Sequence, residues 1–356
     1  MKKLNVAVIF GGYSSEYPVS LKSAHNVITH MNQDKYEVIC IGITKEGNWL
    51  RYYGDVDKIP VDQWQSEGEC SPVILIPDRG AGGIFEHKGE ESKFTKIDVL
   101  FPMIHGRTGE DGCLQGLFEL TGIPYVGCGV LSSAIGMDKD IAHRTVSTIG
   151  VKTTRYVVAE GREKVEDILK RAAHLTYPLF IKPACAGSSI GVSEVTNEEE
   201  FEAAVREAAK YGSKIKIEEK VVGSEVGCSI MGTGENLVVG EVDEIVLEYG
   251  FLNTHLQANP EKGSVNSSIR MPAAYPEEMR DKIRETAVAI YRVMECCGLA
   301  RVDMFVTKEN EIYLNEVNTM PGFTTYSRFP LMMQGRGIEI EEVIDFLIED
   351  AVTRER

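Results

Sequence analysis

Three short runs in the first third of the chain are almost entirely apolar: NVAVIF at 5–10, EVICIGIT at 37–44 and DVLFPMI at 98–104. Strands without alternation between apolar and polar residues are buried on both faces, and such strands occur mainly in parallel sheets covered by helices. Helical periodicity follows at 19–31 and at 113–121. This order predicts an α/β region over residues 1–130, with a parallel sheet and helices on its faces.

The bulk properties exclude several classes of function. The net charge of −16 argues against a broad nucleic-acid surface, because phosphate backbones require clustered lysine and arginine. No apolar run approaches the roughly 18–20 residues that cross a membrane. The eight cysteines contain no C-x-x-C pair, so neither a zinc site nor a disulfide framework is indicated. A cytoplasmic globular protein without nucleic-acid or membrane partners is expected.

The remainder of the 356 residues divides into two further regions. Residues 131–222 begin with a helix around 137–149 and continue with a strand at 177–183, a helix at 198–211 and a strand at 214–222. Residues 223–356 contain strands at 226–232 and 237–247, a helix at 276–297 and a hairpin at 300–318. We therefore expect three packed domains, at 1–130, 131–222 and 223–356, with clefts between them.

The hairpin ARVDMFVTKENEIYLNEVN carries the strongest local signal. If its turn is centred between residues 309 and 310, Asp303 faces Glu316 and Arg301 faces Asn318, all on one face. Two carboxylates this close repel each other unless a cation lies between them. Oxygen ligands from few side chains suit Mg²⁺ together with phosphate. The alternative is a solvated face of an edge hairpin.

Three glycine-containing segments could surround a ligand. In NTMPGFTTYS, the Gly322 N–H could stabilise an oxyanion and Ser327 could donate to a carboxylate. In FIKPACAGSSIGV, Lys182 ends a strand and Ser188 and Ser189 lie between glycines, an arrangement that suits phosphate but also an ordinary turn. Near the N-terminus, Glu16 follows a Gly-Gly turn, where it could hold a ligand ammonium or serve the helix dipole.

Weaker candidates complete the set. Lys139 follows GMD and could be a second phosphate cation, although an isolated surface lysine is commoner. Glu219 and Glu225 flank KVVGS, where a strand entering a hinge could offer groups to adenosine. His105 opens HGRTGEDG after the third apolar strand, at the sheet edge where ligands bind in open α/β folds.

Taken in chain order, these motifs resemble those of the ATP-grasp ligases, and within them the D-alanine:D-alanine ligase family. The resemblance runs from end to end and rests on GGYSSEYPVS, HGRTGEDG, MDK, IKPACAGSSIGV, EEKVVGSEVG, RVDMF and NEVNTMPGFTTYSR. It implies an ATP-grasp fold, in which an N-terminal parallel α/β domain precedes central and C-terminal α+β domains that clamp ATP. It also implies a homodimer.

The resemblance implies a role for each candidate residue. Lys139 and Lys182 would contact the ATP phosphates, with the Ser188–Ser189 loop closing over them. Asp303, Glu316 and Asn318 would bind two Mg²⁺, for which Mn²⁺ could substitute. Arg301 and the Gly322 N–H would stabilise the tetrahedral intermediate, and Glu16 would take the first D-alanine ammonium. Adenosine would be held by Glu219, Lys220, the Val222 backbone and Glu225, and substrate would also meet His105 and Ser327.

Two positions and one segment depart from the family pattern. Tyr17 replaces the usual histidine, and Arg328 replaces an apolar residue of housekeeping members. The segment THLQANPEKGS (254–264) lacks the Glu-Lys-Tyr signature of peptide-forming members and resembles the vancomycin-resistance ligases that make D-alanine:D-lactate ester. We expect this segment to be part of a closing loop. Charged His255 and Arg328 would favour the lactate anion over an ammonium, and His255 would make that preference pH-dependent.

The implied reaction is ATP-dependent activation of D-alanine as an acyl phosphate, followed by attack of D-lactate. D-alanine:D-alanine and D-alanine:D-serine ligation are the alternatives within the same class of enzyme. A module that binds nucleotide without catalysis is the alternative from another class. Such a module should have lost hairpin residues, whereas Arg301, Asp303, Glu316 and Asn318 are all present.

Overall fold

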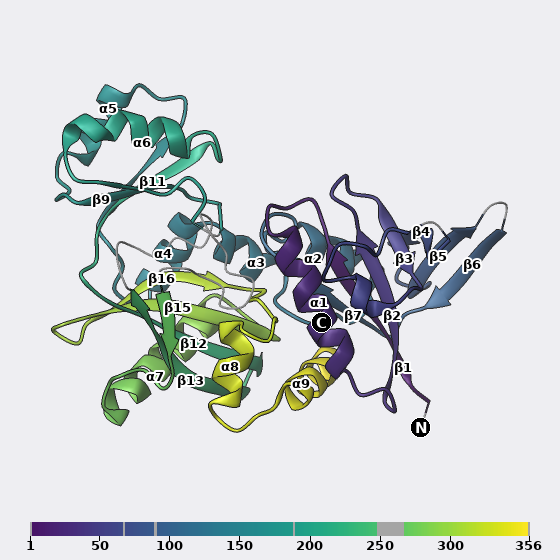
Figure 1. Cartoon of the computed structure of the whole chain (residues 1–356). Coiled ribbons are helices and arrows are strands. Elements are labelled where there is room, and N and C mark those ends of the chain that lie inside the picture. Colours follow the sequence, from purple (N-terminus) through teal and green to yellow (C-terminus); the bar gives the residue numbers. More distant parts are fainter. Residues whose placement is uncertain (1, 67, 89–90, 188, 248–266, 355–356) are drawn as a thin grey trace.

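A computed structural model describes residues 2–66, 68–88, 91–187, 189–247 and 267–354. Its strands form three sheets of seven, four and five strands (Figure 1). None of its helices within these ranges is both long and apolar enough to cross a membrane.

The first sheet begins as the parallel sheet predicted from the apolar runs. Strand β1 (Leu4–Gly11) pairs in parallel with β2 (Tyr36–Ile43) and with β7 (Val99–Met103). Alternate β1 residues enter different cores: Val8 packs in one with helix α1 (Tyr17–His30), and Ile9 in another with helix α2 (Cys113–Thr121). Burial on both faces explains the absence of apolar–polar alternation.

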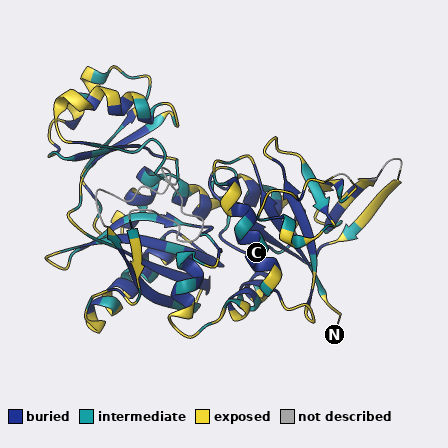
Figure 2. Cartoon of the chain, in the orientation of Figure 1, coloured by how far each residue is buried: buried dark blue, intermediate teal, exposed yellow. Residues whose placement is uncertain are grey.

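Residues 49–96 extend this sheet in a way that the sequence reading did not anticipate. Strands β3 (Trp49–Tyr52), β4 (Cys70–Leu75), β5 (Gly83–Lys88) and β6 (Glu91–Lys96) add in antiparallel order beyond β2, so the sheet is mixed. A short 3-10 helix, η1 (Val56–Lys58), lies between β3 and β4. The outer strand β6 is largely exposed (Figure 2). Such half-solvated strands carry a weaker sequence signal than fully apolar ones.

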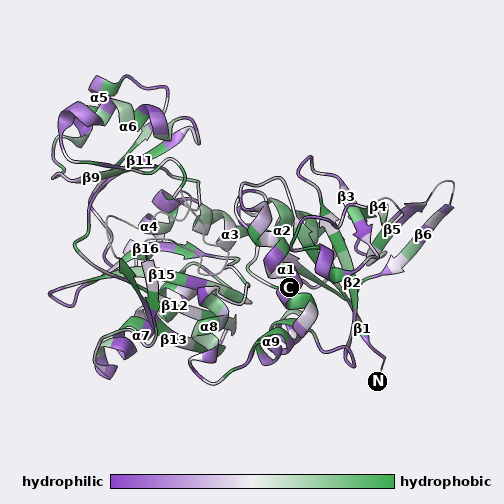
Figure 3. Ribbon diagram, in the orientation of Figure 1, coloured by the Kyte–Doolittle hydropathy of each residue, from purple (hydrophilic) through white to green (hydrophobic). Residues whose placement is uncertain are grey.

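The second sheet is antiparallel, in the order β10-β9-β11-β8. Its strands are β8 (Tyr156–Glu160), β9 (Leu179–Pro183), β10 (Ser193–Val195) and β11 (Lys214–Glu219). Helices α5 (Val165–Ala172) and α6 (Phe201–Ala208) cover its outer face, and both carry hydrophilic residues (Figure 3). A short 3-10 helix, η2 (Glu198–Glu200), precedes α6. The predicted strands and the 198–211 helix are confirmed, with shorter bounds.

The third sheet is also antiparallel, in the order β14-β13-β12-β15-β16. Helix α7 (Glu277–Val293) packs on one face and α8 (Arg328–Gln334) contacts β12 and β13. Two helices that precede the second sheet in sequence, α3 (Val130–Met137) and α4 (Lys139–Ser147), contact β16. The strands are β12 (Gly223–Thr233), β13 (Asn236–Leu247), β14 (Ser267–Arg270), β15 (Leu299–Thr307) and β16 (Ile312–Asn318).

The final helix, α9 (Ile340–Thr353), returns to the first sheet. It contacts α1 and β7 (Figure 1), and its Val343, Ile344 and Leu347 are buried in the same core as Val6 and Phe101. Both ends of the chain therefore build one hydrophobic core.

Candidate active site

A cavity of about 630 Å³ lies where the second and third sheets meet loops of the first. Each of the three sheets or its loops contributes polar or charged side chains to the lining. These include Glu16, His105, Glu110, Lys139, Lys182, Glu218, Glu225, Arg301, Asp303, Glu316, Asn318 and Arg328.

The β15–β16 hairpin has the predicted pairs. Arg301 pairs with Asn318 and Asp303 with Glu316, while Val302 and Val317 are buried on the opposite face. A bulge follows Asp303, because Met304 pairs with Leu314 and Asn315 is the extra residue. The register nearer the turn is therefore shifted by one residue, and the bulge is what brings the two functional pairs opposite each other.

Cationic side chains neutralise both hairpin carboxylates. The Arg301 guanidinium donates to both Asp303 oxygens at 2.7–3.0 Å, and Asn318 Nδ2 donates to Asp303 Oδ2 at 2.9 Å. Lys139 Nζ lies 3.1 Å from Glu316 Oε2. Burial opposes ionisation of Glu316, but Lys139 and Lys182 outweigh it and lower the pKa of this carboxyl to about 2. The sequence reading expected repulsion between the carboxylates, whereas the fold supplies them with counterions.

The donor set fits a hard divalent cation. Asp303, Glu316 and Asn318 present oxygen atoms from one face of the hairpin and line the cavity. Within the described ranges no three His, Cys, Asp or Glu side chains gather as a metal-holding group. Two carboxylates with one amide match Mg²⁺, which takes few protein ligands and completes its shell with phosphate and water.

Arg328 is directed at acidic side chains. Its Nε and Nη2 donate to the two oxygens of buried Asp243 at 2.7 Å, and its Nη1 lies 3.0 Å from Asp303 Oδ1. The guanidinium crosses Gly227, which pairs with both aspartates in the sheet; a Cβ on that glycine would come within 2.2 Å of Nη2. The expected role of Arg328 beside the second substrate remains a prediction.

Glu16 lies between loops of two sheets. It precedes α1 as its N-cap residue, with Pro18 in the first turn. A Cβ on Gly106 would lie 2.6 Å from Glu16 Oε2, and one on Gly187 would lie 3.4 Å from Oε1. The carboxylate is therefore close to the 105–112 loop and to the loop after β9. Neighbouring Tyr17 is a core residue, whose hydroxyl donates to Asp62 at 2.8 Å.

His105 is buried and held in one tautomer. Its Nδ1 is 2.9 Å from the Met320 carbonyl oxygen, so this nitrogen carries the proton. Its Nε2 is 2.9 Å from Ser23 Oγ, which also accepts the Phe323 N–H. The Ser23 hydroxyl therefore donates to Nε2. Burial lowers the pKa of His105 below its usual range, so a neutral imidazole links the first sheet to the segment after β16.

Sequence reasoning missed Glu110, which lies in the same loop as His105. Its carboxylate accepts the Gly106 N–H at 2.6 Å and the Met320 N–H at 3.1 Å. Burial, followed by the charge of Glu16, raises the pKa of Glu110 to about 8. The signal was an acidic residue between the glycines of HGRTGEDG, at the carboxyl end of β7.

The two candidate phosphate cations both line the cavity. Lys139 is the first residue of α4, and the N-cap residue Asp138 accepts the Asp140 and Ile141 N–H groups. The Lys139 Nζ donates to the Ala186 carbonyl at 2.8 Å. Lys182 is the penultimate residue of β9 and forms an ion pair with Glu218 of β11. Glu218 was not a sequence candidate. Strand alternation, which places 214, 216 and 218 on one face, could have indicated it.

The adenosine candidates are spread along the β11–β12 junction. Glu219 accepts the Thr176 N–H at 2.8 Å and lies 3.1 Å from Arg155, while Lys220 pairs with Glu194 at 2.7 Å. Both line the cavity, as does Glu225. Burial raises the pKa of Glu225 to about 7, against the attraction of Arg328. Val222 is exposed, and the described lining contains its neighbours Val221 and Gly223 instead.

The remaining candidates are placed as follows. Ser189 and Gly322 line the cavity. Ser327 Oγ accepts the Thr324 N–H at 2.9 Å and would lie 2.8 Å from a Cβ on Gly322, so it faces the Pro-Gly turn. Ser188 and His255 lie outside the described residues, and their roles remain predictions.

Comparisons with known proteins agree over the whole chain. Family models described as the N-terminus and the C-terminus of D-ala D-ala ligase match residues 5–128 and 145–349. A Streptomyces coelicolor protein provisionally named a D-alanine–D-lactate ligase is 45% identical, with 99% of each chain covered. The vancomycin B-type resistance protein VanB of Enterococcus faecalis is 46% identical, covering 99% of this chain and 100% of its own.

A solved structure is similar to the same extent. The VanG D-Ala:D-Ser ligase from Enterococcus faecalis has a TM-score of 0.90 and 44% identity, and the match covers 99% of this chain and 100% of that one. The expected ATP-grasp fold is thereby confirmed. With both family models and full-length relatives matched, the chain belongs to the D-alanine–D-alanine ligase family of ATP-dependent ligases.

Proposed function

We propose that this protein activates D-alanine with ATP and joins it to D-lactate, which yields an ester for peptidoglycan precursors and confers vancomycin resistance. The observation that carries the proposal is the single cavity that gathers Arg301, Asp303 and Glu316 with the ammonium groups of Lys139 and Lys182. The choice of D-lactate is supported by the names of the Streptomyces coelicolor and VanB relatives and by the sequence of residues 254–264.

ATP would lie between the second and third sheets. Lys139 and Lys182 would contact its phosphates, covered by the Ser188–Ser189 loop, and Arg301 would complete the positive charge. Asp303, Glu316 and Asn318 would hold two Mg²⁺ or Mn²⁺ ions, and the bound metal neutralises charge on the transferred phosphoryl group. The adenosine part would contact Glu219, Lys220, the Val222 backbone and Glu225.

The first step forms the acyl phosphate. A D-alanine carboxylate oxygen attacks the γ-phosphorus, the bond from that phosphorus to the β–γ bridging oxygen breaks, and ADP leaves. Glu16 would hold the D-alanine ammonium, and its position between two loops suits a small zwitterion. The chain's contribution is to orient the carboxylate and to neutralise charge.

The second step forms the ester. The D-lactate hydroxyl oxygen attacks the acyl carbon and the carbon–oxygen bond to phosphate breaks. The hydroxyl proton leaves with the phosphate, so the products are the ester and inorganic phosphate. Arg301 and the Gly322 N–H would stabilise the tetrahedral oxyanion. His105, Ser327, Arg328 and His255 are the candidates for the substrate subsites.

D-Alanine:D-serine and D-alanine:D-alanine ligation remain the alternatives, and the similarity to VanG favours testing D-serine directly. The deciding experiment supplies D-alanine with equal D-lactate, D-serine and D-alanine as acceptors from pH 6 to 9 and quantifies each product. The proposal expects ester to predominate at or below neutral pH. Exclusive formation of either dipeptide would contradict it, and D-alanine-independent ADP release would contradict ligase activity altogether.

The domain limits 1–130, 131–222 and 223–356 are also proposed from the order of the predicted elements, and a cytoplasmic location from the composition. A homodimeric state is proposed from the family resemblance. Limited proteolysis would test the limits, since cleavage should concentrate near residues 130 and 222. Sedimentation equilibrium would test the dimer.

A further inference from the structure

A buried lysine lies directly behind the candidate phosphate lysine. Lys216 of β11 pairs with Lys182 of β9 in the sheet, so both side chains leave the same face. Lys182 lines the cavity. Lys216 is fully buried, at 0% exposure, and is not among the described lining residues.

Both ammonium groups share one carboxylate. Lys182 Nζ pairs with Glu218 Oε1, and Lys216 Nζ lies 2.6 Å from Glu218 Oε2. Thr154 Oγ1 also donates to Oε2 at 2.6 Å. Glu218 is buried, and burial opposes its ionisation, but Lys182 and Lys216 hold its pKa well below the usual range.

A neutral histidine completes the surroundings of Lys216. His143 Nε2 donates to the Asn315 carbonyl at 3.1 Å, so Nδ1 accepts from Lys216 Nζ at 2.9 Å. Burial and then the charge of Lys216 lower the pKa of His143 to about 3, which keeps it uncharged. Lys216 Nζ also lies 4.6 Å from the centre of the Tyr156 ring. Burial lowers the pKa of Lys216 to about 8, so it is mainly protonated at neutral pH.

The cluster therefore holds two ammonium groups and one carboxylate. Burying a charged lysine is costly unless its surroundings compensate for lost hydration. Without Lys216, Lys182 and Glu218 would form a neutral pair, and the carboxylate would cancel much of the field that Lys182 directs into the cavity. With Lys216, one net positive charge remains beside the balanced Lys139–Glu316 pair.

We propose that Lys216 is a positioning residue that offsets the charge of Glu218, so that Lys182 presents an uncompensated positive charge to the phosphates of ATP. The inference rests on the proposed contact between Lys182 and ATP. It predicts that ATP affinity follows the net charge of the cluster, not the identity of residue 216.

The test compares Lys216→Met, Glu218→Gln and the double variant by KM for ATP, Kd for a non-hydrolysable ATP analogue, and melting temperature. Lys216→Met should raise both constants about tenfold, equivalent to about 1.4 kcal/mol, with KM for D-alanine unchanged within about twofold. The double variant has the wild-type net charge and should recover ATP affinity. Glu218→Gln alone should bind ATP at least as tightly as wild type.

Two comparisons separate the possible failures. Lys152→Met removes another paired lysine, one that is half exposed and bonded to Glu311, and should leave ATP affinity unchanged. An unchanged KM in Lys182→Met would overturn the phosphate contact and this proposal with it. A raised KM in Lys182→Met but not in Lys216→Met would overturn the role of Lys216 alone. The role of Lys216 would also be overturned if the double variant bound ATP no more tightly than Lys216→Met. Weaker ATP binding by a folded Glu218→Gln variant than by wild type would overturn it as well.

Discussion

Polar contacts of the hairpin converge on Asp303, which accepts hydrogen bonds from Arg301 and Asn318 and pairs with Arg328. Asp303→Asn should abolish D-alanine-dependent ADP formation, because a proposed metal ligand is lost. It should also lower the melting temperature without metal, since two guanidinium groups lose a buried partner and breaking a buried ion pair costs about 3–5 kcal/mol. ADP release over a Mg²⁺ titration and thermal unfolding measure both effects.

Asp34→Asn is the matched control, because Asp34 is exposed and is not among the described residues that line the cavity. Near-normal turnover of Asp303→Asn would argue against the metal assignment. A raised melting temperature would show that repulsion with Glu316 outweighs the arginine contacts.

Arg328 is a second residue whose buried contacts lead to a prediction. Its bidentate contact with Asp243, which is fully buried, predicts that Arg328→Met destabilises the fold by leaving that carboxylate without its partner. Asp243→Asn in the same chain should restore part of the lost melting temperature. The ester-to-peptide ratio of the single variant separates two roles of the guanidinium: a ratio close to wild type would mean that it serves the carboxylate contacts alone. A changed ratio at normal stability would instead place Arg328 beside the second substrate.

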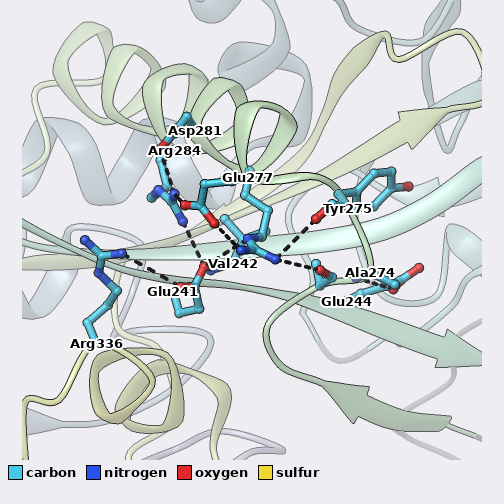
Figure 4. A network of polar contacts seen from close by, with 11 residues as sticks. Glu241, Val242, Glu244, Ala274, Tyr275, Glu277, Asp281, Arg284 and Arg336 are labelled. Carbon is cyan, nitrogen blue, oxygen red and sulfur yellow. Dashed lines mark hydrogen bonds and ion pairs between the residues drawn. The ribbon is translucent and has the colours of Figure 1, made fainter.

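At the scale of elements, a polar network joins α7 to β13 (Figure 4). Arg284 of α7 donates to Glu241 of β13 at 2.8 Å and to Asp281 at 2.6 Å, and it also bonds Glu277. Arg284 and Glu241 are both buried. Arg284→Met should therefore destabilise the protein by about 3 kcal/mol, while KM for ATP stays unchanged because neither Arg284 nor its partners Glu241, Glu277 and Asp281 are among the described lining residues.

The control for that element is Arg336→Met. Arg336 is half exposed, and its distance of 3.8 Å from Glu241 is too long for a hydrogen bond. Its loss should therefore change the free energy of unfolding by less than about 1 kcal/mol. Equal effects of the two variants would mean that Glu241 is not held mainly by α7.

At the scale of the whole molecule, α9 couples the two ends of the chain. Leu347 is fully buried in a core with β1 and β7 residues, whereas the second sheet has its own core around Leu179. The two tryptophans, Trp49 and Trp64, both belong to the region of the first sheet. Leu347→Ala should thus lower the midpoint temperature of the unfolding transition followed by tryptophan fluorescence. The expected loss in the free energy of unfolding is about 2–5 kcal/mol.

Leu179→Ala makes the same deletion in the second sheet. It should lower the midpoint temperature of the transition seen by far-ultraviolet circular dichroism more than that of the transition seen by fluorescence. Equal shifts in both signals would show that the three sheets unfold as one unit.

The sequence alone determined the features that depend on neighbours in the chain. The apolar runs identified β1, β2 and β7, and strand alternation identified the face of the hairpin that carries Arg301, Asp303, Glu316 and Asn318. These features are local, because side-chain alternation and turn residues encode them within a few residues. The turn is centred on residue 309 and not between 309 and 310, so the predicted facing of these residues depends on the bulge. The motifs, taken in chain order, were sufficient to identify the family.

Only the tertiary structure decided which charges meet. Arg328 reaches Asp243, Lys182 shares Glu218 with Lys216, and α9 covers β7, although these partners are far apart in sequence. The antiparallel strands at 49–96 and the bulge after Asp303 were also decided there. The physical reason is that ion pairing and burial depend on distances between separate backbone segments. Those distances follow from the packing of the sheets, which no local pattern in the chain encodes.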